Sequence, residues 1–308
     1  MDLRRLRYFV AVAEELHFGR AAARLRLAQP SLSQQIQALE EEVGAALLNR
    51  NRRRVELTAA GRLLLPEARA VLAQAERALL VARRAGRGEV GRLEIGFTGS
   101  APFNPLLPQT VRRFRERWPD VHLSLNEMPT TAQFEALTAG RLDVGFLRPG
   151  QPMEMVGIAQ RLLLREPLLA VLAADHPLAA AETVGLADLA GQPFILHPRA
   201  IGTGLFDKVM TLCAAAGFTP RIAVEAHQMS TVVTLAAVGM GVSIVPEALR
   251  RLAAPGAAFR PITDAGAFMD LIAACRAEDD SPVVANFLAA LPPADGDGAG
   301  DTPAPQKA

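Results

Sequence analysis

The sequence predicts an α/β protein that carries a separate helical head at its N-terminus. Three observations support this fold class. Residues 1–92 hold 17 arginines against 10 acidic residues, whereas the remaining 216 residues have a net charge of −6, which marks a boundary in composition. Within the head, apolar residues recur at helical spacing. From Arg92 onward, short apolar runs alternate with helical patterns, which is typical of a mainly parallel sheet covered by helices on both faces.

Two short helices joined by a tight turn are predicted within residues 18–42. The first covers residues 19–25. The second starts at about Pro30, and its apolar residues recur at spacings of four, three and four, as one buried helix face requires. Proline suits the first helical position because its missing N–H has no partner there in any case. Uncharged polar side chains therefore point outward at the N-terminal end of the second helix.

This arrangement indicates DNA binding, because a helix-turn-helix inserts the N-terminal end of its second helix into the major groove. A solvated helix face would show the same polar residues, but the charge of +7 in residues 1–92 favours a polyanionic partner. The segment LLNRNRRRVELT predicts a short hairpin wing beside that helix. The expected DNA contacts are Gln29, Pro30, Ser31, Ser33 and Gln34 from the helix, and Arg50, Arg52, Arg53 and Arg54 from the wing.

A long linker helix is expected over residues 59–88, with Thr58 as its N-cap. Its apolar residues repeat at spacings of three and four, as in a coiled-coil seam that would pair two copies of the chain. A helix packed on its own domain would show a similar pattern, and Pro66 predicts a local kink. The seam comprises Leu65, Ala68, Leu72, Ala75, Leu79 and Ala82.

The C-terminal part predicts two similar α/β lobes with a cleft between them, within residues 91–292. Lobe I is expected to hold residues 91–162 and 266–292, and lobe II residues 163–265. The tail, residues 293–308, is too polar and too rich in Pro and Gly to bury a core, so it is expected to be disordered. Strands are expected at 92–97, 121–127, 142–147, 168–173, 194–197, 221–226, 242–246 and 268–275, and helices at 105–118, 133–139, 205–216, 230–238 and 283–291.

Two of these strands end in segments rich in hydroxyl groups, TGSAP at 98–102 and PTTAQ at 129–133. Ligands of open α/β sheets bind at the carboxyl ends of strands, where helix N-termini present free N–H groups to an anion. Helix capping explains each single hydroxyl equally well, and His197 fits a packed surface histidine as well as a ligand contact. The expected ligand-binding residues are Thr98, Ser100, Thr130 and Thr131 from lobe I, and His197, Phe206 and Gln228 from lobe II.

Several longer segments carry a resemblance to a known family. They are LRYFVAVAEELHFGRAAARLRLAQPSLSQQIQALEEEVGAALLNRNRRRVELTAAG at the start, and IGFTG, LTAGRLDVGF and VGMGVSIVP later in the chain. With these motifs, residues 1 to about 292 resemble a LysR-type transcriptional regulator. The resemblance implies a winged helix-turn-helix over residues 1–58, a linker helix that dimerises, and an effector domain built like a periplasmic binding protein, commonly assembled as a tetramer.

The segments IGFTGS and EMPTTAQ are similar to those of the subgroup that senses products of aromatic catabolism. In that subgroup the matching hydroxyls hold a small carboxylate, which makes Ser100 and Thr130 the two preferred positions. The resemblance thus implies a regulator controlled by a small carboxylate or aromatic catabolite. The implied partners are double-stranded operator DNA, RNA polymerase, and further copies of the chain in a homodimer or homotetramer.

Other classes of protein are less well supported. No P-loop, GxSxG, HExxH or CxxC motif is present, so no enzyme, cofactor or metal site is expected. The uncharged stretch 228–246 is interrupted by glycine and hydroxyl residues, and the N-terminus lacks a signal-peptide core, so a cytoplasmic protein without a membrane segment is expected. Two alternatives stay open: a redox-switched regulator that uses Cys213 and Cys275, and a solute-binding or enzymatic α/β domain whose basic head is incidental.

Overall fold

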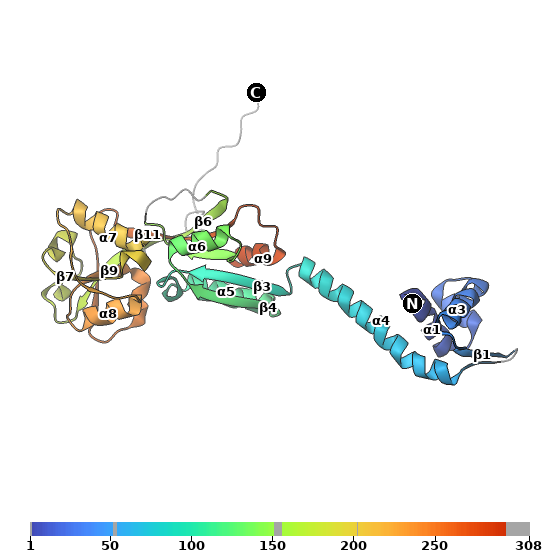
Figure 1. The fold of residues 1–308 in the computed structure, drawn as a ribbon. Helices are drawn as coiled ribbons and strands as arrows, with labels where there is room; N and C mark the ends of the chain where they lie inside the picture. The colour runs from blue at the N-terminus through green and yellow to red at the C-terminus, as the bar shows by residue number, and fades with distance from the viewer. Residues whose placement is uncertain (1, 52–53, 151–155, 202, 294–308) are drawn as a thin grey trace, which may run out of the picture. The chain divides into compact units, whose positions relative to one another are not determined.

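The computed structural model describes residues 2–51, 54–150, 156–201 and 203–293. It divides into two compact units, Met1–Arg84 and Ala85–Ala308, and Figure 1 shows the elements of each. Residues 294–308, nearly all of the tail expected to be disordered, lie outside the described residues.

The first unit contains the predicted helix-turn-helix. It consists of α1 (Leu3–Glu15), α2 (Phe18–Leu25) and α3 (Gln29–Val43), followed by β1 (Leu48–Asn51), β2 (Arg54–Leu57) and α4 (Ala59–Gly86). Leu32, Ile36 and Leu39 of α3 are fully buried against Phe9 and Val12 of α1, as the spacing of the apolar residues predicts. Proline lies in the first turn of α3, after the N-cap residue Ala28.

The predicted wing is an antiparallel hairpin in which Leu48 pairs with Leu57 and Asn51 with Arg54. The Thr58 hydroxyl joins this hairpin to the long helix. It donates a hydrogen bond to the Ala46 carbonyl at 2.6 Å and accepts one from the Gly61 N–H at 2.9 Å. Thr58 therefore caps α4, as the sequence predicts.

The apolar seam of α4 has two different environments. Ala68 is buried, and Leu65 and Leu72 pack against the core of the first unit. Leu79, by contrast, is 59% exposed, and its neighbours Leu80 and Val81 are also exposed. The first half of the seam therefore packs against the core of the first unit, whereas the second half is exposed in a single chain.

Lobe I of the second unit is built on three parallel strands. β3 (Gly91–Phe97) lies between β4 (Val121–Glu127) and β5 (Val144–Leu147), and β5 pairs antiparallel with β11 (Phe268–Arg276). The lobe also contains η1 (Ala101–Phe103), α5 (Leu106–Arg117), α6 (Thr130–Thr138) and α9 (Pro282–Ala290). Phe287 meets Phe114 and Phe146 edge to face in its core.

Two long strands pass from lobe I to lobe II. β6 (Ile158–Ala173) pairs with β11 up to Pro167, and from Leu168 it pairs with β9 (Ser243–Pro246) and β10 (Ala257–Pro261). The expected strand 168–173 is thus the second half of a longer one, and β10 was not predicted. Because β6 and β11 run antiparallel to their neighbours, most pairings of the seven-stranded sheet are antiparallel, and the expectation of a mainly parallel sheet was wrong in this respect.

Lobe II contains a parallel pair, β7 (Pro193–Leu196) and β8 (Arg221–Glu225), with the helices α7 (Thr203–Ala215) and α8 (Met229–Ala237). Figure 1 shows these elements gathered on the far side of β11 from α5, α6 and α9. Four short helices complete the lobe: η2 (Pro177–Ala180), η3 (Leu186–Leu189), η4 (Arg199–Ile201) and η5 (Glu247–Leu252).

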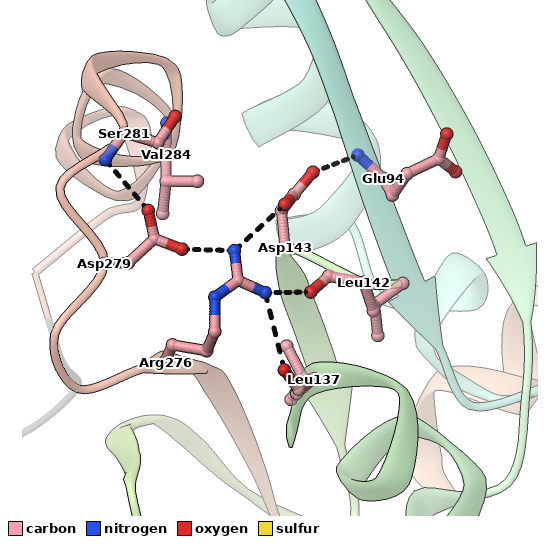
Figure 2. A network of polar contacts seen from close by, with 8 residues as sticks. All are labelled: Glu94, Leu137, Leu142, Asp143, Arg276, Asp279, Ser281 and Val284. Atoms are coloured by element: carbon pink, nitrogen blue, oxygen red, sulfur yellow. Dashed lines mark hydrogen bonds and ion pairs between the residues drawn. The ribbon is translucent and has the colours of Figure 1, made fainter. Parts of the chain in front are cut away.

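A polar network ties the far end of β11 to the rest of lobe I (Figure 2). Arg276, the last residue of β11, donates to the Leu142 carbonyl at 2.7 Å and forms ion pairs with Asp143 at 3.2 Å and Asp279 at 2.5 Å. Asp143 in turn accepts from the Glu94 N–H of β3, and Asp279 accepts from the Ser281 N–H at the start of α9. One guanidinium thus holds two strands and a helix together.

None of the described helices is long and apolar enough to cross a membrane. Within the described ranges, no three His, Cys, Asp or Glu side chains gather as a metal site would require.

Candidate functional site

A cavity of about 260 Å³ lies between the two lobes. Since a water molecule occupies ~30 Å³ of liquid, this volume suits a metabolite of on the order of ten non-hydrogen atoms. Lobe I lines the cavity with Thr98, Gly99, Ser100, Glu127, Met128, Pro129, Thr130 and Arg148, and lobe II with His197, Gly204, Leu205, His227, Gln228 and Met229.

The lobe I wall is shaped by a buried glutamine behind it. The Gln133 side chain, fully buried, donates to the Met128 carbonyl at 2.9 Å and to the Phe146 carbonyl at 3.3 Å. Gly96 and Gly145 are paired in the sheet, and a Cβ on either would lie within about 3.0 Å of the Gln133 amide oxygen. The glycines of the IGF and VGF segments therefore make room for the amide that holds the ends of these strands.

Arg148 is the most unusual residue of the cavity. Its side chain is 3% exposed, and one terminal nitrogen forms an ion pair with Glu166, which is also buried. Two further nitrogens, Nε and Nη1, are buried without a hydrogen-bond partner among the described residues. Burial lowers the pKa of this guanidinium, and the charge of Glu166 opposes that effect. A second anion beside Arg148 would satisfy its unpaired donors.

Glu166 is held on its other side by lobe II. Its Oε1 accepts a hydrogen bond from the Ala248 N–H at 2.6 Å, in the short helix η5. Arg148 of lobe I is thereby connected to lobe II through a single buried carboxylate.

Two hydroxyl groups of the cavity wall also lack a hydrogen-bond partner among the described residues. The Thr98 hydroxyl is buried without a partner within the described ranges. The Ser100 side chain is 4% exposed and makes no hydrogen bond in the part of the chain that the structure describes. Thr130 differs, because its hydroxyl accepts from the Arg148 N–H at 3.2 Å and donates to the Arg148 carbonyl at 3.3 Å. Of the two preferred positions, only Ser100 keeps an uncommitted hydroxyl.

Three helices begin at the cavity. α6 starts at Thr130, α8 at Met229 and α7 directly before Gly204, and each of these residues lines the cavity. Neither α6 nor α8 has a side-chain cap. Their first N–H groups and partial positive charges therefore add to the electrostatic field of Arg148.

Two of the three residues expected from lobe II line the cavity. His197 is buried at the end of β7 and lines the cavity, as does the exposed Gln228 before α8. Phe206 instead packs against the hydrophobic core of lobe II. Its neighbour Leu205 packs against the same core and also lines the cavity. Thr131 is exposed and lies outside the cavity lining, because the start of α6 turns its side chain away from that of Thr130.

Arg148 and Glu127 were not predicted from the sequence. Glu127 is the last residue of β4, and Arg148 follows directly after β5. A charged residue at the end of a strand can indicate a ligand site, because ligands of α/β sheets bind there. The sequence does not reveal that these two strand ends meet at one cavity.

The lobes touch through their main chains beside the cavity. A Cβ placed on Gly204 would lie 2.1 Å from the Arg148 carbonyl oxygen, and one on Gly150 would lie 2.3 Å from the Gly204 carbonyl oxygen. Any side chain at position 204 would force the start of α7 away from lobe I.

The expected DNA-contacting residues of the helix lie at its accessible end. Gln29, Pro30, Ser31 and Gln34 are exposed in the first turns of α3, and Ser33 is half-buried. In the wing, Arg50 belongs to β1 and Arg54, at the start of β2, is exposed. Arg52 and Arg53 lie outside the described residues.

The chain matches two family models that together cover nearly all of it. The model for the bacterial regulatory helix-turn-helix protein of the lysR family matches residues 3–62, and the model for the LysR substrate binding domain matches residues 86–294. The chain is a LysR-type transcriptional regulator.

Similar proteins agree with this assignment over their full length. The regulator is 43% identical to the uncharacterized HTH-type transcriptional regulator YnfL of Escherichia coli (strain K12), over 93% of this chain and 96% of that one. It is 38% identical to AlsR of Bacillus subtilis (strain 168), over 94% of each. The crystal structure of full-length CbnR complexed with target DNA superposes with a TM-score of 0.81 at 33% identity, covering 94% of this chain and 98% of CbnR.

This LysR-type regulator is thus not an enzyme, and it joins a DNA-binding head to an effector-binding domain. Its two cysteines do not favour redox switching. Cys213 is fully buried in lobe II and Cys275 is buried in lobe I, in separate core clusters. Burial raises the pKa of the Cys213 thiol to about 11 and also raises that of Cys275. A reactive cysteine needs the opposite, an accessible thiol with a lowered pKa.

Proposed function

We propose that this LysR-type regulator responds to a small carboxylate bound in the cavity between its lobes. The observation that carries the proposal is Arg148, a buried cation with two unpaired nitrogens at the cavity wall. The hydroxyls of Thr98 and Ser100 and the N-termini of α6 and α8 offer further donors to the same space. Donors without acceptors in a buried site favour an anion strongly, because each unmet donor is otherwise unfavourable.

The proposed effector acts by favouring one arrangement of the lobes. It would contact Arg148 from lobe I and Gln228 from lobe II, so its binding depends on how closely the lobes approach. A ligand shifts a conformational equilibrium only through its different affinities for the two states. The main-chain contact at Gly204 and the buried Glu166 bridge are the parts of the domain that such a shift would alter.

For the head, we propose that α3 reads the major groove through Gln29, Ser31, Ser33 and Gln34, with Pro30 opening the helix. The arginines of the wing, Arg50, Arg52, Arg53 and Arg54, would contact phosphates or the minor groove. The exposed second half of the α4 seam supports pairing of two chains as a homodimer, and a homotetramer is proposed on the family resemblance alone. RNA polymerase remains a predicted partner on the same ground.

The effector site is tested by fluorescence anisotropy against DNA from upstream of the regulator's own gene, with candidate aromatic and dicarboxylic acids added. Ser100→Ala should lose the response to the active acid while its affinity for DNA stays nearly unchanged. Thr131→Ala is the matched control, because that hydroxyl lies one residue past the cavity lining. An unaltered dose response in Ser100→Ala would remove the site assignment.

The DNA contacts are tested with the same DNA and with a random duplex. Gln34→Ala should weaken binding to the specific DNA by ~1–3 kcal/mol and leave the random duplex unaffected. Arg54→Ala should weaken both and reduce the slope of log K against log salt by about one. The exposed Arg113 on α5 provides the control variant Arg113→Ala. Equal losses on both DNAs for Gln34→Ala would contradict base reading by α3.

A further inference from the structure

The cavity contains one group that an anion site does not explain. Glu127, the last residue of β4, lines the same cavity as Arg148. Its carboxylate makes no hydrogen bond or ion pair in the part of the chain that the structure describes. A carboxylate without a cation beside it repels a second negative charge, so its presence limits which acids the cavity accepts.

The backbone opposite Glu127 leaves room for its carboxylate. A Cβ on Gly99 would lie 2.7 Å from the Glu127 Oε1, closer than atoms of this kind approach. Glu127 pairs in register with Phe97, two residues before Gly99, so adjacent strands deliver both residues to the cavity mouth. The acidic side chain therefore lies close to the loop that also carries Thr98 and Ser100.

The cavity thus combines groups of opposite chemistry. Arg148, Ser100 and the helix N-termini offer donors. Glu127 offers carboxylate oxygens, which in the ionised form only accept hydrogen bonds. Across the cavity, lobe II contributes the exposed His227 and Gln228, and the described lining residues of that lobe include no Lys or Arg.

Building on the proposed effector site, we propose that the effector is a small acid that also carries a hydroxyl or amino group, and that Glu127 accepts a hydrogen bond from that group. A dicarboxylate of the same length would place its second negative charge next to Glu127. A plain monocarboxylate would leave Glu127 without a donor. Hydroxy acids and amino acids satisfy the donors and Glu127 at once.

The test uses three four-carbon acids that differ only at the far end: 4-hydroxybutyrate, 4-aminobutyrate and succinate. Binding of each to the full chain is measured by isothermal titration calorimetry. The parent chain should bind the better of the first two roughly 10-fold to 100-fold more tightly than succinate, the range that a hydrogen bond to a charged group provides. Glu127→Gln should remove most of this preference, because its amide accepts less strongly and can donate to the second carboxylate of succinate.

The control variant is Glu135→Gln, which removes an exposed carboxylate on α6 outside the cavity lining and should keep the parent ranking. Equal or tighter binding of succinate by the parent chain, or an unchanged ranking in Glu127→Gln, would overturn the role of Glu127 while leaving the effector site in place. Binding that survives unaltered in Ser100→Ala would count against the proposed effector site itself, whereas no binding of 4-hydroxybutyrate or 4-aminobutyrate would overturn the proposed effector class.

Discussion

Replacing Arg148 by methionine separates the two roles of this guanidinium, stability and ligand binding. Arg148 and Glu166 are 3% and 5% exposed, so the substitution leaves a carboxylate buried without its cation. Removal of one partner from a buried ion pair costs ~3–5 kcal/mol, because the other charge stays desolvated. We expect the free energy of unfolding of the effector domain to fall by about that amount.

A double variant identifies the cause of this loss. In Arg148→Met combined with Glu166→Gln, the glutamine oxygen still accepts from the Ala248 N–H, but no buried charge remains. Neutral replacement of a buried ion pair is commonly close to neutral for stability. The double variant should therefore return to within ~1 kcal/mol of the parent chain. Both variants should lose the response to carboxylates, since the unpaired guanidinium nitrogens are gone.

The assay is urea denaturation followed by tryptophan fluorescence. The chain has one tryptophan, Trp118, which packs against Phe114 in the lobe I core with ring centroids 5.0 Å apart, so its emission reports this lobe. The slope of free energy against urea should match between variants, which makes the midpoints comparable. If Arg148→Met unfolds at the parent midpoint, or the double variant is no more stable than the single one, the buried pair is not coupled as described.

Three further predictions follow from other contacts. Gly204→Ala should weaken binding of the effector at least tenfold without unfolding lobe II, because its Cβ would lie 2.1 Å from a lobe I carbonyl oxygen; unchanged affinity in calorimetry would show that the lobes need not touch there. Arg276→Met should destabilise lobe I by ~2–4 kcal/mol in the Trp118 assay, since it removes the cation beside Asp143 and Asp279 and the donor to two carbonyls. A loss under ~1 kcal/mol would contradict the network in Figure 2. Cys213 should resist iodoacetamide at pH 8 in the folded chain and react once urea is added. Because burial raises its pKa from the ordinary 9.0 to about 11, the folded chain retains this proton longer than the unfolded chain, so its contribution to stability is present below pH 9 and is lost as the pH rises through about 11; rapid labelling of the folded chain at pH 8 would restore the redox alternative.

The head could be predicted almost completely from the sequence, because its signals are local. These signals determine structure only within a few residues of their own positions. They are the apolar spacing in α3, the proline at its start and Thr58 before α4. The linker helix α4 shows what such local signals cannot predict. A three-four repeat predicts one apolar stripe, but it does not say that Leu65 and Leu72 face their own head whereas Leu79 stays exposed. That division depends on where the core of the first unit ends.

The cavity was predicted in outline and corrected in detail. Strand ends rich in hydroxyls led to Thr98, Ser100 and Thr130, since parallel strands bring their carboxyl ends to one edge of a sheet. Whether each hydroxyl is available was decided by neighbours distant in the sequence, and Thr130 is committed to the backbone of Arg148. Thr131 lies outside the cavity lining because one helical step, about 100°, separates its side chain from that of Thr130, and Phe206 packs against the lobe II core.

By itself, the sequence determined the two-unit organisation, the type of nearly every element and the family, because periodicity, capping residues and charge distribution are properties of contiguous chain. Only the tertiary structure decided which charges are buried and which are paired. Arg148 meets Glu166 because β6 crosses between the lobes, and Glu127 meets the same cavity from another strand. A charge is stabilised or destabilised by what surrounds it in space, and that environment is assembled from segments that no local pattern connects.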